Sequence, residues 1–143
     1  MPKQAKQSEK KCILIVEDSV DFSNLLKFIV EDEGFDGIQF PIDQPDIVAW
    51  AKKHKPAVIL VDLALRRKTG MEYIEDLKED AETKTIPIII ITGRELGLKE
   101  VVDLQLRGIK YLRKGRVELD EIKNEIRLSA GLKVRLPIPS GKK

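Results

Sequence analysis

The chain has 143 residues, a length that suits one domain and lets it bury a core without disulfide or metal cross-links. Hydrophobic residues make up 42% of it and charged residues 35%, and its apolar runs are far shorter than the ~20 residues that cross a bilayer, which excludes a membrane-spanning protein. The net charge of +2 divides into basic ends around an acidic centre, which argues against a dedicated nucleic-acid binder, whose folded domain would present a basic face.

Strand-like and helix-like apolar patterns alternate through the first half of the chain. Residues 12–16 (CILIV) form a continuous apolar run rich in β-branched residues, which is typical of a strand buried on both faces. A helical stripe follows and ends before Gly34, and its apolar members are Phe22, Leu25, Leu26, Ile29 and Val30. The next elements are a weaker strand at 37–40, a helix at 43–54 that ends before Pro56, and a strand at 57–61.

The second half continues this alternation. After a loop at 63–69, Gly70 introduces a helix whose inward residues are Met71, Ile74, Leu77 and Ala81. The remaining elements are a strand at 86–91, a helix carrying Leu98, Val101 and Val102, a short strand at 109–112, and a last helix with Leu119, Ile122, Ile126 and Ala130 inward. Strands that are apolar on both faces and alternate with helices predict an α/β fold, in which helices cover both faces of a doubly wound parallel sheet.

Charge divides the chain into three parts. Residues 1–10 form a basic N-terminal tail, residues 11–130 the folded domain, and residues 131–143 a basic, proline-containing C-terminal tail that is expected to extend from the domain. The single cysteine, Cys12, cannot build a disulfide framework, and the start of the chain lacks the apolar segment of a secretory signal. The cytoplasm is therefore the expected compartment.

Acidic, hydroxyl and basic residues follow four of the predicted strands. Glu17 and Asp18 follow the first strand, Asp62 the third, Thr92 ends the fourth, and Lys114 follows the fifth. Ligand sites in open parallel sheets lie outside the carboxyl ends of the strands. We therefore expect three carboxylates, a hydroxyl and an ammonium group to meet at one edge of the sheet.

Such a set of side chains suits phosphoryl chemistry with a divalent cation. Neighbouring carboxylates repel one another, and Mg²⁺ holds one or two of them together with waters and a substrate phosphate. A carboxylate beside the ion can attack phosphorus and become an acyl phosphate. Lys114 would balance the charge of the phosphoryl oxygens, and the hydroxyl of Thr92 could donate a hydrogen bond to one of them.

Five segments of the chain look like those of a known family. They are VEDS at 16–19, VDLAL at 61–65, Gly70, IPIIIITG at 86–93 and YLRK at 111–114. Over residues 11 to about 130, these segments and the spacing of their charged residues resemble the receiver domain of bacterial two-component response regulators, with the single-domain chemotaxis regulators nearest in size. The resemblance implies a flavodoxin-like, five-stranded sheet of strand order 2-1-3-4-5.

The resemblance also implies an acceptor and a metal site. Asp62 would be the phosphoacceptor, and a Mg²⁺ cofactor would be held by Asp18, by Glu17 largely through water, by Asp62 and by the backbone carbonyl of Ala64. The phosphoryl donor would be a sensor histidine kinase or a histidine phosphotransfer protein. The chain would then be a signalling domain that catalyses only its own phosphotransfer and dephosphorylation, and not an enzyme acting on other substrates.

A switch follows from the same resemblance. Thr92 would be the switch hydroxyl that moves to the phosphoryl group, Tyr111 the aromatic residue that turns inward behind it, and Lys114 the partner of the phosphate. The face made by the fourth helix, fifth strand and fifth helix would then change shape and bind an output protein, which the sequence does not identify. Ala64 and Arg94 occupy the two positions that tune phosphoryl lifetime in the family. Homodimerisation is left open.

The chain departs from the family pattern at three places. Gly115 replaces the proline that usually follows the lysine through a cis peptide, so we expect a trans Lys114–Gly115 bond or a reshaped loop. Arg66 replaces the usual proline four residues after the phosphoacceptor and begins the basic run 66–68. Gly108 stands one residue nearer to Tyr111 than is common, which predicts an altered fourth helix or exit from it.

Each candidate residue also has a simpler interpretation. Asp18 could cap the first helix, Thr92 could be an ordinary strand-end residue, Lys114 a solvated lysine, and Tyr111 an edge-strand aromatic. The basic run 66–68 could be a solvated loop or could help dock a phosphodonor. Asp62 is harder to explain in this way, because an acid directly after AVILV would be poorly solvated without a partner.

Three other functions stay open from the sequence. The first is a pseudo-receiver, an interaction module that works without phosphorylation. The second is the receiver part of a larger regulator with an effector or DNA-binding domain. The third is a small-molecule phosphohydrolase of similar topology, which is disfavoured because Ala64 stands where a second catalytic acid would be expected.

Overall fold

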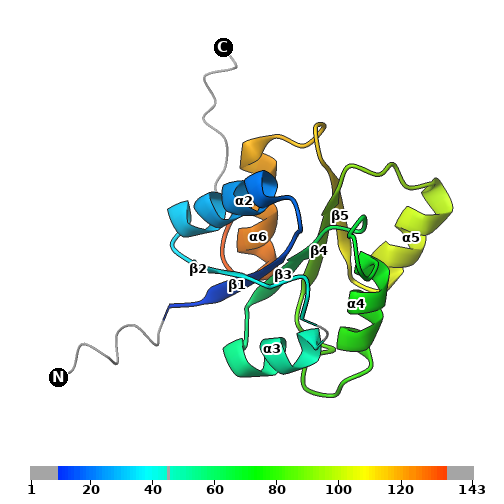
Figure 1. Ribbon diagram of the computed structural model, residues 1–143. Coiled ribbons are helices and arrows are strands. Elements are labelled where there is room, and N and C mark those ends of the chain that lie inside the picture. Colours follow the sequence, from blue (N-terminus) through cyan, green and yellow to red (C-terminus); the bar gives the residue numbers. More distant parts are fainter. Residues whose placement is uncertain (1–9, 45, 135–143) are drawn as a thin grey trace, which may run out of the picture.

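We describe a computed structural model of the chain over residues 10–44 and 46–134 (Figure 1). Strands and helices alternate along these residues in the order β1 (Cys12–Val16), α2 (Val20–Asp32), β2 (Asp36–Gln39), α3 (Ile47–His54), β3 (Val58–Val61), α4 (Gly70–Lys78), β4 (Ile88–Thr92), α5 (Leu98–Leu106), β5 (Lys110–Arg113) and α6 (Leu119–Ser129). None of the described helices is long and apolar enough to cross a membrane. The predicted N-terminal tail lies outside the described residues except for Lys10, and the predicted C-terminal tail lies outside them from residue 135 onward.

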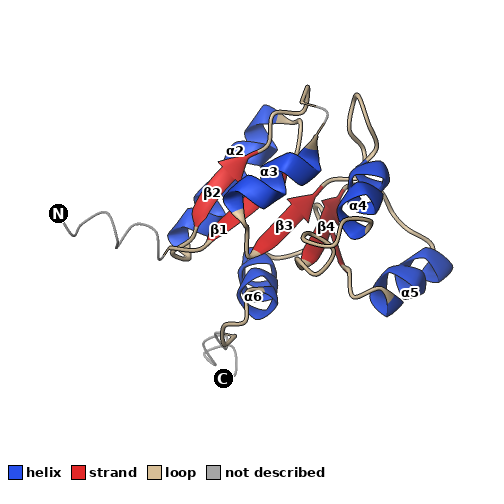
Figure 2. Ribbon diagram, turned by 90° about the horizontal axis from the view of Figure 1, so that it is seen from below, coloured by secondary structure: helices blue, strands red, loops and turns tan. Residues whose placement is uncertain are grey.

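The five strands form one parallel sheet in the order β2-β1-β3-β4-β5, which confirms the predicted flavodoxin-like α/β fold. Helices α2 and α6 cover one face of this sheet, and α3, α4 and α5 cover the other (Figures 1 and 2). The strand order reverses between β1 and β3. In such sheets the crevice beside the carboxyl ends of those two strands is the usual place for a ligand.

Each face of the sheet has its own apolar core. Along β1, Ile13 and Ile15 pack into the core beneath α2 and α6, while Leu14 and Val16 pack into the core beneath α3, α4 and α5, and all four are fully buried. Successive side chains of a strand point to opposite faces, so a central strand must be apolar throughout. The central strands of the sheet therefore appear in the sequence as continuous apolar runs.

Side-chain caps set the starts of helices. The hydroxyl of Ser19 accepts a backbone N–H of the first turn of α2, so Ser19 caps this helix and Asp18 does not. A carboxylate oxygen of Asp46 caps α3 in the same way at 3.0 Å. The prediction that this helix begins at residue 43 is therefore wrong, and it begins at Ile47.

Two further predicted boundaries are wrong. The helix that begins at Gly70 ends at Lys78, where the buried Thr83 donates a hydrogen bond from Oγ1 to the carbonyl of Leu77 at 2.6 Å and thus satisfies the open helix end. The fourth strand begins at Ile88 and not at residue 86, because Pro87 has no N–H to donate to the sheet.

Five of the apolar residues that define the predicted helices are exposed: Leu25, Ala81, Leu98, Val102 and Leu119. Leu25 lies at the margin of the α2 stripe, whose buried members include Leu26 and Ile29. Ala81 falls in the turn after α4, and Leu119 is the first residue of α6, where the helix has not yet reached the sheet. The core therefore contains fewer of the helix residues than the apolar pattern predicts.

Candidate functional site

A buried ion cluster lies where β1 and β3 end. Glu17 follows β1 and Asp62 follows β3, its neighbour in the sheet, and their side chains are only 2% and 6% exposed. Lys114 follows β5 and places its Nζ 3.0 Å from Oε1 of Glu17 and 3.2 Å from Oδ2 of Asp62. The structure therefore brings together three predicted site residues that are up to 97 positions apart in the sequence.

Burial and the neighbouring charges have opposite effects on the pKa values of Glu17 and Lys114. Burial raises the pKa of Glu17, although hydrogen bonds from the Ser19 N–H and from Lys114 act against the rise. Burial lowers the pKa of Lys114, but the hydrogen bond to Glu17 and the charge of Asp62 outweigh it, so the pKa is raised overall. The ammonium group also lies 4.3 Å from the ring centre of Phe22. Lys114 is thus held as a cation.

The backbone around Asp62 is closely packed. Its Oδ1 accepts a hydrogen bond from the N–H of Ala64 at 3.3 Å, and the Gly70 N–H donates to the carbonyl of Leu63 at 3.0 Å. A Cβ atom at position 70 would stand 2.2 Å from the Asp62 carbonyl oxygen, a distance no side chain tolerates. Only glycine lets the start of α4 approach the acid this closely.

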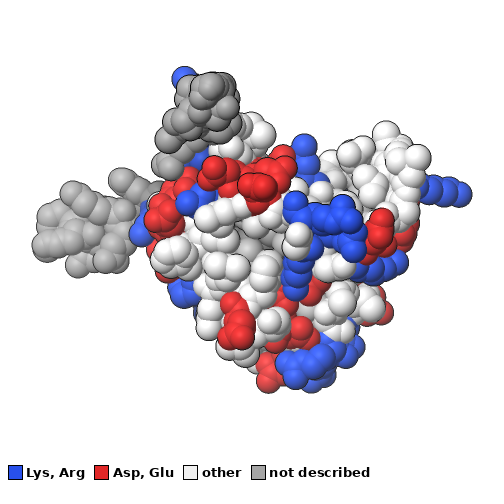
Figure 3. All heavy atoms as spheres, turned by 90° about the horizontal axis from the view of Figure 1, so that it is seen from above, with Lys and Arg blue, Asp and Glu red and all other residues white. Residues whose placement is uncertain are grey.

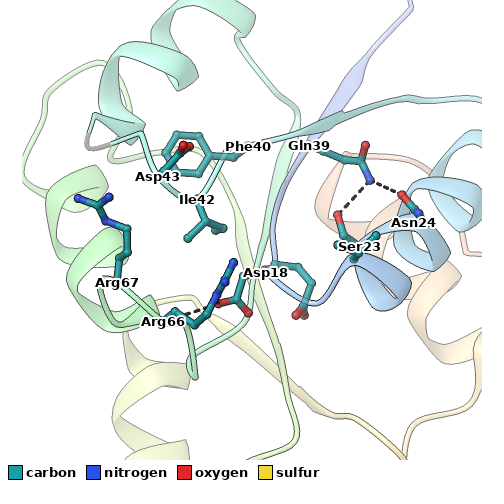
Figure 4. Close-up of a pocket in the computed structure, with 11 residues that line it drawn as sticks. Asp18, Ser23, Asn24, Gln39, Phe40, Ile42, Asp43, Arg66 and Arg67 are labelled. Atoms are coloured by element: carbon teal, nitrogen blue, oxygen red, sulfur yellow. Dashed lines mark hydrogen bonds and ion pairs between the residues drawn. The ribbon is translucent and has the colours of Figure 1, made fainter.

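Asp18 faces a different cation. Its Oδ2 accepts hydrogen bonds from both the backbone N–H of Arg66, at 2.8 Å, and the side-chain Nε of the same residue, at 3.1 Å. Asp18 is 13% exposed and the arginine side chain 78% exposed. The pair lies at one wall of a cleft of about 510 Å³ between the ends of β1 and β2 and the β3–α4 loop, with Ser23 and Gln39 on the opposite wall (Figure 4).

Thr92 ends β4 and is fully buried. Its hydroxyl accepts a hydrogen bond from the backbone N–H of Arg94 at 3.3 Å, and its carbonyl accepts one from the backbone N–H of Lys114 at 2.8 Å. The threonine and the lysine are therefore tied together through the backbones of β4 and the residue after β5.

Tyr111 belongs to β5 and is half-buried. Its hydroxyl donates to the carbonyl of Arg94 at 2.9 Å and accepts the N–H of Leu96 at 3.4 Å. The side chain of Arg94 points instead to Glu100 in the first turn of α5, with Nη2 at 3.2 Å from Oε2. Tyr111 thus fastens the loop between β4 and α5.

The carboxylate oxygens of Glu17, Asp18 and Asp62 are ligands that a hard divalent cation prefers. In this structure, these carboxylates are paired with Lys114 and Arg66. Oε1 of Glu17 is buried without a hydrogen bond of good geometry, despite its 3.0 Å ion pair with Lys114. Among the described residues, however, no three His, Cys, Asp or Glu side chains are arranged so that they could hold a metal ion. In this arrangement the ammonium group of Lys114 contacts both Glu17 and Asp62, and Arg66 pairs with Asp18.

Sequence reasoning missed three contributors to this site. Phe22 was assigned only to the apolar stripe of α2, and no sequence signal indicates its contact with Lys114. Gly70 was noted as a family-like residue, but not for its approach to Asp62. The basic run 66–68 divides in the structure, because Arg66 contacts Asp18 while Lys68 pairs with Asp76 and lies over the ring of Tyr73.

The loop after Lys114 differs from the family pattern as expected. The described residues contain no cis peptide bond, so the Lys114–Gly115 bond is trans. Gly115 has a φ of +82°, a backbone conformation that glycine adopts without strain. The prediction of a trans bond is confirmed.

Charged side chains on the surface gather in patches of both signs. On the face drawn in Figure 3, clusters of Lys and Arg lie beside clusters of Asp and Glu, and a continuous basic surface is not seen there among the described residues.

The chain resembles known proteins in both sequence and fold. The response regulator receiver domain family matches residues 13–127. The fold is similar to the signal receiver domain of a putative Luxo repressor protein from Vibrio parahaemolyticus, with a TM-score of 0.73 and 25% identity over 85% of this chain and 91% of that one. It is also similar to chemotaxis protein CheY4 of Vibrio cholerae (TM-score 0.71, 18% identity, 84% and 98% covered) and to the BeF3-activated N-terminal receiver domain of RstA from Klebsiella pneumoniae (0.71, 22%, 84% and 98%).

Proposed function

The chain belongs to the response regulator receiver domain family of two-component systems, and from this membership and the site geometry we propose that it accepts a phosphoryl group on Asp62. The observation that carries the proposal is the buried pairing of this carboxylate with Lys114 at the carboxyl end of β3. A buried acid that serves only structure has no need of a position at the crevice of the sheet.

The proposed reaction transfers the phosphoryl group from a histidine of a sensor kinase or a histidine phosphotransfer protein. An Asp62 carboxylate oxygen forms a bond to phosphorus while the bond between phosphorus and the histidine nitrogen breaks. Lys114 stands close enough to the acceptor oxygen to balance negative charge that develops on the phosphoryl oxygens. The N–H of Ala64 holds the other carboxylate oxygen and so orients the nucleophile.

Receiver domains generally depend on Mg²⁺, and we propose that Glu17, Asp18, Asp62 and the backbone carbonyl of Ala64 would hold it here. The bound ion would neutralise the carboxylates and the phosphoryl oxygens, which otherwise repel one another. The chain's own cation, Lys114, cannot do this alone, because it already faces two acids.

We further propose that phosphorylation is read through Thr92 and Tyr111. The hydroxyl of Thr92 would turn from the Arg94 N–H toward the phosphoryl group, and Tyr111 would follow by changing its bonds to the β4–α5 loop. The resulting change on the face of α5, β5 and α6 would be recognised by an output protein. Ala64 and Arg94 would set the lifetime of the phosphoryl group. The cytoplasm is the proposed location of this exchange.

The proposal is tested by incubating the protein with Mg²⁺ and acetyl phosphate and measuring its intact mass. We expect a gain of one phosphoryl group in the wild type, none in Asp62→Asn, and an unchanged gain in Asp43→Asn, which alters another acid at the same cleft. Absence of the adduct in the wild type, or its persistence in Asp62→Asn, would overturn the proposal.

An interaction module that works without phosphorylation is the second candidate. It is favoured by one observation, the bonds of Arg66 to Asp18, which occupy an acid that the metal would need. This candidate predicts no adduct at any Mg²⁺ concentration, together with partner binding that Asp62→Asn leaves intact.

A further inference from the structure

The β3–α4 loop carries an arginine that the proposed chemistry does not use. Arg66 stands four positions after Asp62, and its side chain reaches back to Asp18 across the cleft mouth (Figure 4). We propose that Arg66 is a resident cation that competes with the divalent metal for Asp18 and thereby lowers the metal affinity of the site. This inference rests on the proposed function, since it concerns the same metal ligands.

The contacts of Arg66 support competition directly. Its backbone N–H and its Nε both bind the same oxygen, Oδ2, so one carboxylate oxygen of Asp18 accepts two hydrogen bonds. A carboxylate oxygen engaged in this way has less capacity to coordinate a cation. The arginine side chain is 78% exposed, so little packing holds it in place and it can leave the carboxylate when a stronger cation arrives.

The charge balance of the three carboxylates also supports competition between Arg66 and a divalent cation. Glu17, Asp18 and Asp62 carry three negative charges, and Lys114 neutralises only one of them. A divalent cation is attracted by the remaining two. Arg66 removes one of these two without adding a ligand, so it reduces the attraction felt by the incoming ion.

The neighbouring basic residues do not share this role. The ammonium group of Lys68 pairs with Asp76 and lies over the ring of Tyr73, away from Asp18. Arg67 lines the same cleft as Arg66, but its side chain is directed away from Asp18 (Figure 4). Arg67 therefore offers a matched control with the same charge, in the same loop, without the contact.

The experiment measures Mg²⁺ binding to the unphosphorylated full chain by isothermal titration calorimetry. We expect Arg66→Ala to bind Mg²⁺ about two- to fivefold more tightly than the wild type, the range that corresponds to the strength of exposed ion pairs, and Arg67→Ala to change the affinity by less. The backbone N–H of residue 66 remains in the variant, so the position of Asp18 is preserved. The difference between the two variants should shrink at high salt.

Each alternative outcome has a defined meaning. Unchanged or weaker Mg²⁺ binding by Arg66→Ala would overturn the inference, and weaker binding would make Arg66 a positioning residue. Equal effects of the two variants would also overturn it, because charge alone would then explain them. If neither the wild type nor Arg66→Ala binds Mg²⁺, the metal part of the proposed function fails as well, whereas binding with unaltered affinity overturns only the competition by Arg66.

Discussion

Buried glutamates meet basic side chains at both ends of the sheet, but the two clusters are balanced differently. At the carboxyl end, Lys114 alone serves Glu17 and Asp62. Near the amino end, Glu33 at the close of α2 is contacted by two cations of α6, Lys123 and Arg127, each at 3.7 Å, and Lys123 also pairs with the exposed Asp32 at 3.0 Å. Both glutamate side chains are almost fully buried, at 2% and 1% exposed.

The two clusters differ in the balance of their acidic and basic side chains. A buried acid with enough cations of the chain around it joins two elements and requires nothing more, as Glu33 joins α2 to α6. A cluster with more acid than base keeps an attraction for a further cation, and it lies where the sheet opens to solvent. Excess negative charge at the crevice, and not burial by itself, is what sets the proposed phosphoacceptor site apart from the Glu33 cluster.

The largest predicted effect concerns the backbone that supports each end. Gly70→Ala would force a Cβ to within 2.2 Å of the Asp62 carbonyl oxygen, so we expect a loss of about 3 kcal/mol in the free energy of unfolding. Gly37→Ala, near the amino end, would meet side-chain atoms of Lys27 and Val30 at 2.9 and 3.0 Å, which can move, and should cost about 1 kcal/mol. Urea unfolding measures both, and equal losses would contradict a specially close-packed carboxyl end.

The second-largest effect is a difference in the free energy of unfolding between variants of Lys114 and Lys123. Lys114→Met leaves two buried carboxylates without their cation, so we expect a loss of about 2 kcal/mol in divalent-free buffer, below the cost for a fully buried pair because the lysine is 24% exposed. Lys123→Met should cost less, since Arg127 still faces Glu33. Urea unfolding of both variants in a chelating buffer makes the comparison. A larger loss for Lys123→Met would show that the clusters do not differ as described.

A smaller effect concerns the loop at the carboxyl end. Tyr111→Phe removes a hydroxyl that donates to Arg94 and accepts from Leu96, and we expect a loss of about 1 kcal/mol in the free energy of unfolding. Hydrogen exchange should quicken in the β4–α5 loop, while the exchange of residues 35–39 at β2 stays unchanged. A uniform change across the chain would mean that this hydroxyl does not act locally.

The smallest effect is a pH dependence at the amino end of β1. Burial, and then the charge of Asp36, raise the pKa of Cys12, whose Sγ donates to the carbonyl of His54 at 3.3 Å. The raised pKa favours folding below the ordinary thiol pKa, and this contribution is lost as pH rises through the value in the folded protein. Alkylation by iodoacetamide should therefore reach half its limiting rate at a higher pH in the folded protein than in urea. A profile at the same or lower pH would contradict this.

The sequence predicted the fold well because the strands are apolar on both faces and are separated by helices. It also placed Glu17, Asp62 and Lys114 at strand ends, where parallel pairing must bring them to one edge. Element boundaries were less predictable, since Asp46 and Thr83 set them through single hydrogen bonds that hydrophobic periodicity does not encode.

The arrangement of side chains within the site could not be predicted from the sequence. Arg66 was noted there as a departure from the family pattern, but its choice of Asp18 depends on how the β3–α4 loop turns back. The contact of Phe22 with Lys114 likewise depends on where α2 lies above the sheet. The spacing of residues in the sequence predicts which residues belong to the site. Which of these residues contact one another depends on how the loops and helices are placed.

The backbone N–H of Lys114, which donates a hydrogen bond to the carbonyl of Thr92, can be used to measure the stability of the sheet edge at β5. Because β5 is the last strand of the sheet, we expect this N–H to exchange with solvent when β5 separates locally from β4. Its protection factor would thus give the free energy of edge opening at the residue that faces both buried acids. A single resolved amide signal in an NMR spectrum would then report how firmly the backbone that carries Lys114 is held beside β4.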